Sequence, residues 1–386
     1  MAVPSSATPA MLRSLNERTV LEAIRAGAPI SRAEISRRVG ISKPTVSLAL
    51  RSLLDAQLVR EVNGDHSRGR YGATLFESIP EARLVLGLDM GARFLRGAIC
   101  DLHGVVRARQ DIETAGAGAD ELFDAASELK AQLLDASELS AQALDGAVIG
   151  VPGVVDPANG AVRLAANIRG LEGREVGREL EARLGVGVSV SNDINLAAVG
   201  ERWRGIARGI DNFAFLSVGT GLGAGLVIGG ELITGHRGGA GEIDFALDGS
   251  QGDDPCAAAI SDYAATRAAS RSLPTRLEPP YALPAIFASA RAGDRLAEAV
   301  VAEAARRVAV NVMPIAAVVD VALVVLGGGI GSNGDLLLAP IRQRLADHLP
   351  FPPRVEVSIL GDAAVLTGAL AVGLGAALEN AFAQRA

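Results

Sequence analysis

The sequence has few residues of the kinds that define disulfide-linked, membrane or secreted proteins. Its 386 residues include only two cysteines, Cys100 and Cys256, far apart in the chain. We therefore expect neither a disulfide framework nor a four-cysteine zinc module, and a reducing, cytoplasmic location. The longest apolar stretch, 308–331, is interrupted by polar residues and a proline, so we expect no membrane span. The first residues do not follow the pattern of a secretory signal.

Charged and aromatic residues are also scarce, at 21% and 3% of the chain, whereas hydrophobic residues make up 49%. This composition excludes a largely disordered protein, and the length suits two or three domains. Residues 1–75 hold 11 Lys and Arg against 6 Asp and Glu, whereas the rest holds 26 against 38. A basic segment joined to an acidic body indicates a nucleic-acid-binding module, although a chance fluctuation of charge gives the same split.

Helix signals dominate the first 55 residues. Apolar residues at helical spacing over 12–24 predict a first helix, and Ser31 with Glu34 forms a capping-box pattern for a second, which Gly40 ends. Ser42 caps a third helix, whose polar outer face is typical of the recognition helix of a helix-turn-helix. The side chains of this third helix that we expect at DNA are Ser42, Lys43, Thr45, Ser47 and Arg51.

A two-stranded wing is predicted after the third helix, with strands at 58–62 and 73–76. The loop between them carries Arg68 and Arg70, which suit phosphates or the minor groove. A plain helical hairpin with a solvated charged face is the alternative. The expected organisation is a winged helix-turn-helix domain at 1–76, a linker at 77–83 and a body at 84–386.

The body contains glycine turns that lead from one strand back into another. The strand from Leu84 ends in Asp89-Met-Gly91, and a second strand follows at 95–100. Dinucleotide-binding and P-loop motifs lead into a helix instead, so both are disfavoured. A glycine-lined hairpin can present backbone N–H groups to a phosphate, with the aspartate beside a divalent cation.

The same device recurs at Gly219-Thr220-Gly221, and a third glycine turn containing Gly328 follows the apolar strand 321–326. Each turn alone is compatible with a simple tight turn. Their corresponding positions in two halves predict a duplicated α/β fold that grips a nucleotide or phosphate from both sides.

Another strand, beginning at Val188, ends in Asn192 and Asp193 before a helix expected at 196–204. Polar groups at the carboxyl ends of strands bind small molecules in open α/β sheets. Asp193 has the chemistry of a general base toward a hydroxyl group, but an Asp-x-Asn helix cap explains the same residues equally well.

Together these residues resemble the ROK family of repressors, open reading frames and kinases, within the actin, Hsp70 and sugar-kinase superfamily. The resemblance covers nearly the whole chain and implies a winged helix-turn-helix followed by a two-lobed, actin-like α/β body. The segments that carry it in the head are 12–16, 31–35, 42–47 and 69–70. Those in the body are 89–91, 152–156, 191–201, 219–221 and 238–243.

The resemblance also implies roles for individual residues. Asp193 corresponds to the catalytic base of the family's kinases. The implied sugar-binding residues are Asn167, Asn192, Asp193 and Glu242. The implied phosphate loops, functional or vestigial, contain Asp89, Gly91, Gly219, Thr220, Gly221 and Gly328.

The sequence departs from the family pattern at both metal and phosphate motifs. Ala92-Arg93-Phe94 follows Gly91 where family kinases have Gly-Thr-Lys or a close variant, so ATP would be crowded. Asp244-Phe245 replaces the Gly-His pair whose histidine binds zinc, and Cys256 is the one cysteine left of the family's cluster. The glutamate that usually follows the last cysteine is also missing. We therefore predict no metal, no zinc and no required cofactor, with Mg-ATP needed only by a kinase.

We expect a sugar-responsive DNA-binding transcriptional regulator of carbohydrate metabolism. In this hypothesis a homodimeric or tetrameric repressor leaves an inverted-repeat operator when a sugar or sugar derivative binds in the kinase-like cleft, and no membrane takes part. One alternative is an ATP-dependent sugar kinase with Asp193 as general base. Another is a constitutive DNA-binding protein whose body only dimerises. The sequence does not identify the sugar, the operator or the sign of regulation.

Overall fold

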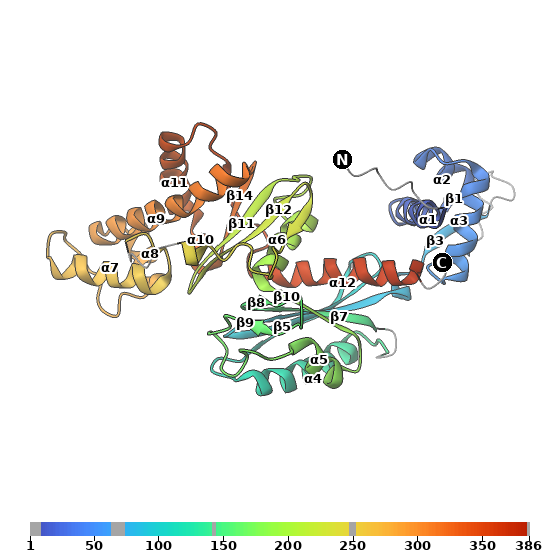
Figure 1. Ribbon diagram of the computed structural model, residues 1–386, viewed down its shortest axis with the longest axis horizontal. Coiled ribbons are helices and arrows are strands. Elements are labelled where there is room, and N and C mark those ends of the chain that lie inside the picture. Colours follow the sequence, from blue (N-terminus) through green and yellow to red (C-terminus); the bar gives the residue numbers. More distant parts are fainter. Residues whose placement is uncertain (1–8, 63–73, 141–143, 247–251, 384–386) are drawn as a thin grey trace.

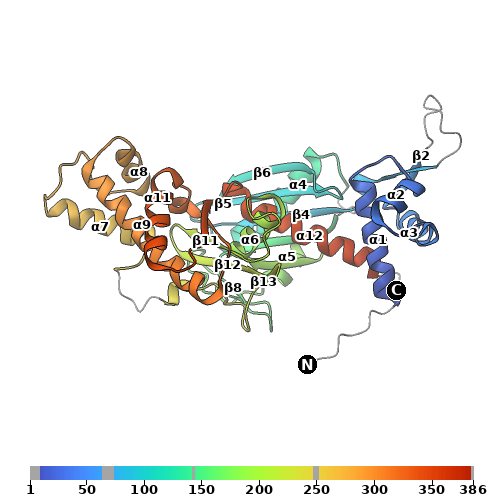
Figure 2. The same cartoon turned by 90° about the horizontal axis from the view of Figure 1, so that it is seen from above.

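The computed structural model describes residues 9–62, 74–140, 144–246 and 252–383, which form a small N-terminal head and a two-lobed body (Figure 1). A long C-terminal helix, α12 (Ala364–Ala383), begins between the lobes and ends against the head. Figure 2 shows the same arrangement from above, with the head at one end of the molecule.

The head contains three helices and a three-stranded antiparallel sheet. The helices are α1 (Pro9–Arg25), α2 (Arg32–Val39) and α3 (Lys43–Asp55), and the sheet has the order β1 (Ile30–Ser31), β3 (Leu75–Ser78), β2 (Val59–Val62). This confirms the predicted winged helix-turn-helix.

The predicted helix ends of the head are present. The Ser31 hydroxyl accepts the Glu34 N–H at 3.3 Å, and the Ser42 hydroxyl accepts the Thr45 N–H at 3.4 Å. Gly40 ends α2 with a φ of 69°, in the left-handed region that favours glycine. The Glu34 carboxylate pairs with Arg37 rather than reaching back to the cap, so the printed contacts support only the serine half of the capping box.

The second wing strand lies two residues later than predicted. It runs over Leu75–Ser78 instead of 73–76, because it pairs with both neighbouring strands and buries Phe76 and Ser78 on alternate positions. The strand therefore extends into the segment expected to be a linker. Arg68 and Arg70 lie outside the described residues.

The body contains two five-stranded mixed sheets with the same order of strands. In each sheet the first three strands form an antiparallel meander, and the fourth and fifth continue in parallel on the other side of the first. The first sheet contains β4 (Leu84–Met90), β5 (Phe94–Asp101), β6 (Val106–Glu113), β7 (Leu144–Val151) and β10 (Val188–Asn192). The second contains β11 (Phe213–Val218), β12 (Leu222–Ile228), β13 (Glu231–Ile233), β14 (Leu323–Gly327) and β15 (Arg354–Val357).

This repeated order confirms the duplicated α/β fold. The third glycine turn differs from expectation, because the residues after β14 form a short helix, α10 (Gly328–Gly331). Helix α6 (Asp193–Arg204) begins three residues earlier than predicted. A small hairpin of β8 (Val154–Val155) and β9 (Val162–Arg163) lies after β7.

Helices cover the sheets of both lobes. In the first lobe α4 (Ala119–Ala136) and α5 (Val176–Leu184) pack on one face of the sheet, while α12 packs against β4 and β7. The second lobe carries α7 (Ala257–Ala269), α8 (Leu283–Arg291), α9 (Arg295–Val319) and α11 (Gly334–His348).

The two helices that join the lobes, α6 and α12, cross at very close range. A Cβ atom added at Gly368 of α12 would overlap the carbonyl oxygen of Leu196, and one at Gly200 of α6 would overlap that of Ala364. Only glycine permits this approach of the two backbones. The crossing therefore holds the N-terminal half of α12 against α6.

Helix α12 and its preceding turn, Gly361–Phe382, are long and apolar enough to cross a membrane, with a mean hydropathy of 1.6. In the structure Leu366, Leu370 and Leu374 are buried in a core shared with the head. Burial within the protein thus accounts for part of the apolar character of this segment, 44% of which is buried.

Candidate DNA interface and interlobe site

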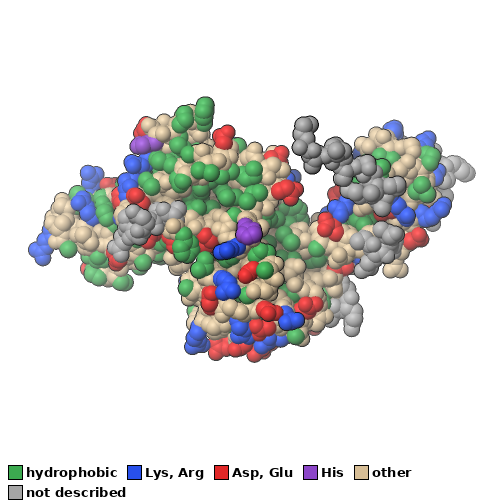
Figure 3. All heavy atoms as spheres, viewed as in Figure 1, with side chains coloured by type: hydrophobic (Ala, Val, Ile, Leu, Met, Phe, Trp, Pro, Cys, Tyr) green, Lys and Arg blue, Asp and Glu red, His purple; other side chains and the backbone are tan. Residues whose placement is uncertain are grey.

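The predicted DNA-contacting residues lie along the outer side of α3. Lys43 and Arg51 are exposed, and Thr45 and Ser47 are half-exposed. The opposite face of α3 is buried, with Val46, Leu50 and Leu53 in the core of the head, so the polar face is free to enter a groove of DNA. In Figure 3, Lys and Arg side chains lie around the outer rim of the head.

Two residues of this face were missed by the sequence reasoning. Arg32, at the start of α2, donates to the Ser47 hydroxyl at 3.1 Å and so adds a second cation beside α3. Leu48 is 65% exposed, although most apolar residues of α3 are buried. Its helical position, three residues after Thr45, would have placed it on the polar face.

The head is fixed to the body at the far end of α12. Val20, Leu21 and Ile24 of α1 share a core with Leu374 and Phe382 of α12. On the surface of this contact the Arg18 guanidinium lies 3.5 Å from the Glu379 carboxylate and 5.7 Å from the centre of the Phe382 ring.

Polar contacts also join the wing segment to the first lobe. The Ser78 hydroxyl lies 2.7 Å from Nε2 of His103, and the N–H of Leu102 donates to the carbonyl of Pro80 at 2.9 Å. The junction of head and body is therefore packed at both α12 and the first sheet.

In the body, the predicted phosphate and sugar residues follow the carboxyl ends of the strands. β4, β7 and β10 are parallel, so Asp89 and Asn192 come to the same edge of the first sheet. β11 and β14 are parallel in the second sheet, which brings Gly219 near the backbone of Gly329. This is the edge where open α/β sheets bind ligands.

In the first predicted phosphate loop an arginine side chain lies beside the aspartate. Gly91 donates its N–H to the carbonyl of Phe94 at 2.9 Å, and the Arg96 guanidinium lies 3.1 Å from Asp89, its cross-strand neighbour. Arg96 also lies 3.5 Å from Asp111 and packs 5.0 Å from the Phe94 ring. The cation beside Asp89 is thus a guanidinium, so this carboxylate as it stands does not fit a Mg²⁺ ion.

The second phosphate loop remains open. Thr220 and Gly221 are exposed between β11 and β12, and Gly219 accepts the N–H of Ala257 at 2.8 Å. Gly328 has a φ of 78° and packs so closely on the end of β11 that a side chain would meet the carbonyl of Val218. The second hairpin therefore combines exposed loop residues with a glycine that packs closely on the neighbouring strand.

The interlobe region holds carboxyl groups whose pKa values are raised mainly by burial. Burial raises the pKa of Asp193 to about 7, and the charges of Asp89 and Glu242 add to this rise. Burial also raises the pKa of Asp89 to about 6, although Arg96 opposes the rise, and it raises the pKa of Glu242. Buried or half-buried carboxyl groups with raised pKa values are typical of ligand-binding or catalytic sites, although structural clusters share this property.

The amide residues of the predicted sugar site differ in their surroundings. Asn192 is the N-cap of α6: its Oδ1 accepts the N–H of Asn195 at 2.9 Å, and its Nδ2 donates to the carbonyl of Gly153 at 3.0 Å. The cap is therefore Asn192, while Asp193 is the first residue of the helix and accepts the N–H of Ile194. Asn167 lies exposed in a turn after β9.

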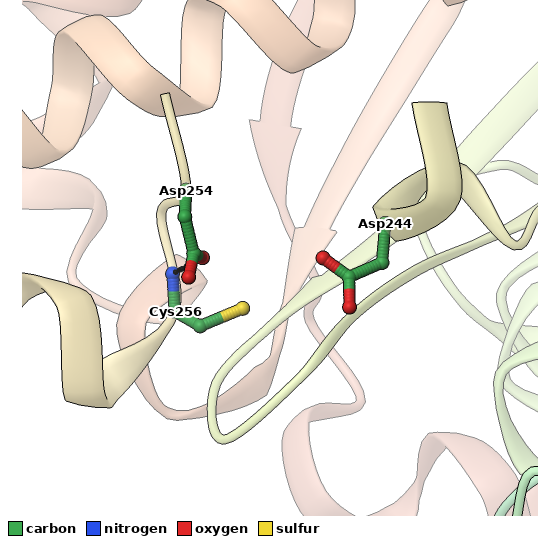
Figure 4. A group of neighbouring side chains, drawn as sticks. All are labelled: Asp244, Asp254 and Cys256. Carbon is green, nitrogen blue, oxygen red and sulfur yellow. Dashed lines mark hydrogen bonds between the residues drawn. The ribbon is translucent and has the colours of Figure 1, made fainter. Parts of the chain in front are cut away.

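A group of possible metal ligands lies where the family motif places zinc. Oxygens of Asp244 and Asp254 and the sulfur of Cys256 lie within 4.8 Å of one another (Figure 4). Phe245, in the position of the family's histidine, is 71% exposed. Burial, together with Asp254, raises the pKa of the Cys256 thiol. One thiol and two carboxylates do not fit the family's tetrahedral zinc, which takes Cys and His ligands.

Comparison with known proteins agrees with this geometry. The ROK family model matches residues 85–375, and a model for winged helix-turn-helix DNA-binding domains matches residues 13–60. The xylose repressor of Caldicellulosiruptor bescii is 26% identical over 94% of this chain and 96% of its own length. The glucokinase of Thermotoga maritima is 29% identical, but over 70% of this chain and 89% of its own.

Among the solved structures, too, a regulator matches nearly the whole chain, whereas a kinase matches about three quarters of it. A ROK family transcriptional regulator, a homologue of the E. coli MLC protein, superposes with a TM-score of 0.79 over 97% of this chain and 98% of its own, at 22% identity. The ROK family glucokinase of Streptomyces griseus, solved with glucose and AMPPNP, gives a TM-score of 0.63 over 75% of this chain and 98% of its own, at 26% identity. The chain therefore belongs to the ROK family, and it is one of the members that carry an N-terminal winged helix-turn-helix DNA-binding domain.

Proposed function

We propose that this protein is a sugar-responsive transcriptional repressor of the cytoplasm, which binds operator DNA through the head and a sugar or sugar derivative between the lobes. The observation that carries the proposal is the continuity of α12, which starts beside the interlobe carboxylates and ends in the core of the head. The similarity to xylose repressors over nearly the whole chain supports xylose or a related sugar as the first effector to test.

Helix α12 is the route by which the two sites would communicate. In the turn just before α12, Asp362 lies 3.7 Å from Arg96, which in turn contacts Asp89. At its end, Glu379 pairs with Arg18 of the head. A sugar that binds the closed arrangement of the lobes better than the open one would turn α12 and with it the head, which lowers the affinity for the operator.

A repressor of this kind needs two heads to read an inverted repeat, so we propose a homodimer. Hydrophobic side chains gather on the face of the second lobe in Figure 3, and Val318 and Phe351 are 83% and 81% exposed. Exposed apolar surface on a soluble domain is typical of an association site. Sedimentation of the full-length protein tests this directly: a purely monomeric species at micromolar concentration contradicts it.

The second candidate function is an ATP-dependent sugar kinase with Asp193 as base. The open Gly219–Gly221 loop and the raised pKa of Asp193 favour it. Against it, the Arg96 guanidinium lies at Asp89, where a metal-bound nucleotide would be held. ADP release over a panel of sugars, abolished by Asp193→Asn, would establish the kinase.

The test of the repressor is a DNA titration of the full-length protein with and without xylose, glucose and their phosphates. We expect salt-sensitive binding to duplexes from the region upstream of its own gene, weaker binding to random duplex, and loss of the specific binding with one sugar. Equal binding to both duplexes contradicts DNA-sequence recognition. Specific binding that no sugar alters, combined with no sugar-induced rise in melting temperature, contradicts the sensing role.

A further inference from the structure

The outer face of α3 carries one large apolar side chain among polar ones. Leu48 is 65% exposed and lies three residues from both Thr45 and Arg51, so the three side chains are neighbours along one ridge of the helix. A helix built only to contact phosphates would have no use for leucine at this position, because an aliphatic side chain neither donates nor accepts a hydrogen bond.

Leu48 also lines a groove between α1 and α3. The groove has a volume of about 530 Å³, and its walls include Leu12, Thr45, Leu48 and Arg51. On the other flank of α3 a second groove is lined by Arg32, Lys43 and Ser47, with Arg51 lining both. The recognition helix is therefore a ridge with a cationic flank and a mixed flank, in which Leu12, Leu48 and Ala49 lie beside Arg13, Glu17 and Asp55.

The bases of DNA offer one apolar group in the major groove, the C5-methyl of thymine. At the corresponding position guanine and adenine present hydrogen-bonding groups, which an apposed leucine would leave unpaired and desolvated, and cytosine has a C5 atom without the methyl group. An exposed leucine at the middle of the ridge therefore both favours thymine and disfavours the other bases at the position it faces.

We propose that Leu48 determines part of the DNA sequence preference of this protein by packing against the C5-methyl group of a thymine. This inference rests on the proposed DNA-binding function and deepens it, because it assigns one base to one side chain. A protein partner that covers the same leucine is the competing interpretation, and it makes a different prediction below.

The experiment uses a duplex enriched by the full-length protein from a randomised library. Each thymine of that duplex is replaced in turn by deoxyuridine, which removes the methyl group and keeps all hydrogen bonds. We expect one replacement per half-site to weaken binding about four-fold, because the burial of one methyl or methylene group contributes about 0.8 kcal/mol. In Leu48→Ala the same replacement is expected to have no effect.

The matched control is Leu15→Ala, since Leu15 is 59% exposed on α1 and does not line the groove. This variant should keep the full uridine effect. Two results overturn the inference: no single uridine weakens binding of the wild type, or Leu48→Ala retains the effect. The first result, with Leu48→Ala binding as tightly as the wild type, would favour a protein partner. Failure to enrich any duplex overturns the proposed function itself, and this inference with it.

Discussion

The charged residues of the two candidate sites, one in the head and one in the body, lie in opposite environments. Lys43 and Arg51 of the head are exposed, whereas Asp89 is 5% exposed and Asp193 is half-buried between the lobes. An exposed cation loses little hydration on folding and remains available to DNA phosphates. A buried carboxylate, in contrast, makes the folding stability depend on pH through its shifted pKa. Substitutions in the head should therefore change binding alone, and those in the body should change binding and stability together.

The largest expected effect is on folding stability and concerns the crossing of α6 and α12, which belongs to the body. Gly368→Ala places a methyl group against the backbone of Leu196, so α6 or α12 must shift, and we expect a loss of about 1–3 kcal/mol or more. Gly375→Ala is the matched control on the same helix, because nothing lies within 4 Å of a Cβ atom added at that exposed position. It should gain up to about 1 kcal/mol from helix propensity. Thermal unfolding of both variants decides this; equal melting temperatures contradict the close crossing.

Removal of a cation from α3 should have the second largest effect, and it should change only the affinity for DNA. We expect Arg51→Ala or Lys43→Ala to weaken binding to the enriched duplex by about 10- to 100-fold, since a base or phosphate contact is worth about 1–3 kcal/mol. Arg295→Ala removes an exposed cation from the body, where the side chain pairs with Glu298 of the same helix, and should bind DNA normally. Gel-shift titrations at two salt concentrations check both. If the α3 variants lose stability instead, the separation of roles in the head is wrong.

The body should respond to pH through Asp193, whose pKa rises from 3.8 to about 7 on folding. A carboxyl group that binds its proton more tightly in the folded state contributes stability that is complete below about pH 4 and is lost as the pH rises through 7. Asp193→Asn should therefore raise the melting temperature at about pH 8 and reduce its fall between about pH 5 and 8. Asp89, with a pKa of about 6, should account for part of the slope that remains.

A surface carboxylate provides the contrast for this measurement. Arg291 holds the pKa of Asp335 below its usual value through a paired contact at 2.7 Å. Asp335→Asn should cost at most about 1 kcal/mol, because the pair is exposed, and should leave the slope between about pH 5 and 8 unchanged. A slope unaffected by Asp193→Asn would show that this carboxyl is not the group that titrates.

The same contrast explains which features the sequence could predict. The caps at Ser31, Ser42 and Gly40 depend on residues three or four apart, so local rules located the helices of the head. In the body, the glycine hairpins and the duplication of the fold followed from the repeated glycine motifs. The contact of Arg96 with Asp89 could have been found by counting residues across the hairpin, since the two are register partners.

Other features depend on packing between distant segments, which no local pattern encodes. The approach of Asp362 to Arg96 and the burial of α12 against the head join residues more than 200 positions apart. The sequence reasoning also took the polar residues of α3 as the whole DNA-facing surface and so passed over Leu48. A rule that places apolar residues inside and polar residues outside cannot identify an exposed apolar residue that has a function.

The smallest expected effect tests the junction at which the two regions meet. Arg18→Ala removes one exposed ion pair and one contact with the Phe382 ring, so stability should change by about 1 kcal/mol or less. Arg295→Ala, which removes an exposed pair with Glu298 inside α9 of the body, is the control. Both variants should bind DNA as the wild type does when no sugar is present. Only Arg18→Ala should reduce the loss of DNA affinity that the sugar causes, because the head then follows α12 less closely. If both variants respond fully to the sugar, the signal passes through the buried core of the junction or through the first sheet at Ser78 and His103, and the surface pair serves only stability.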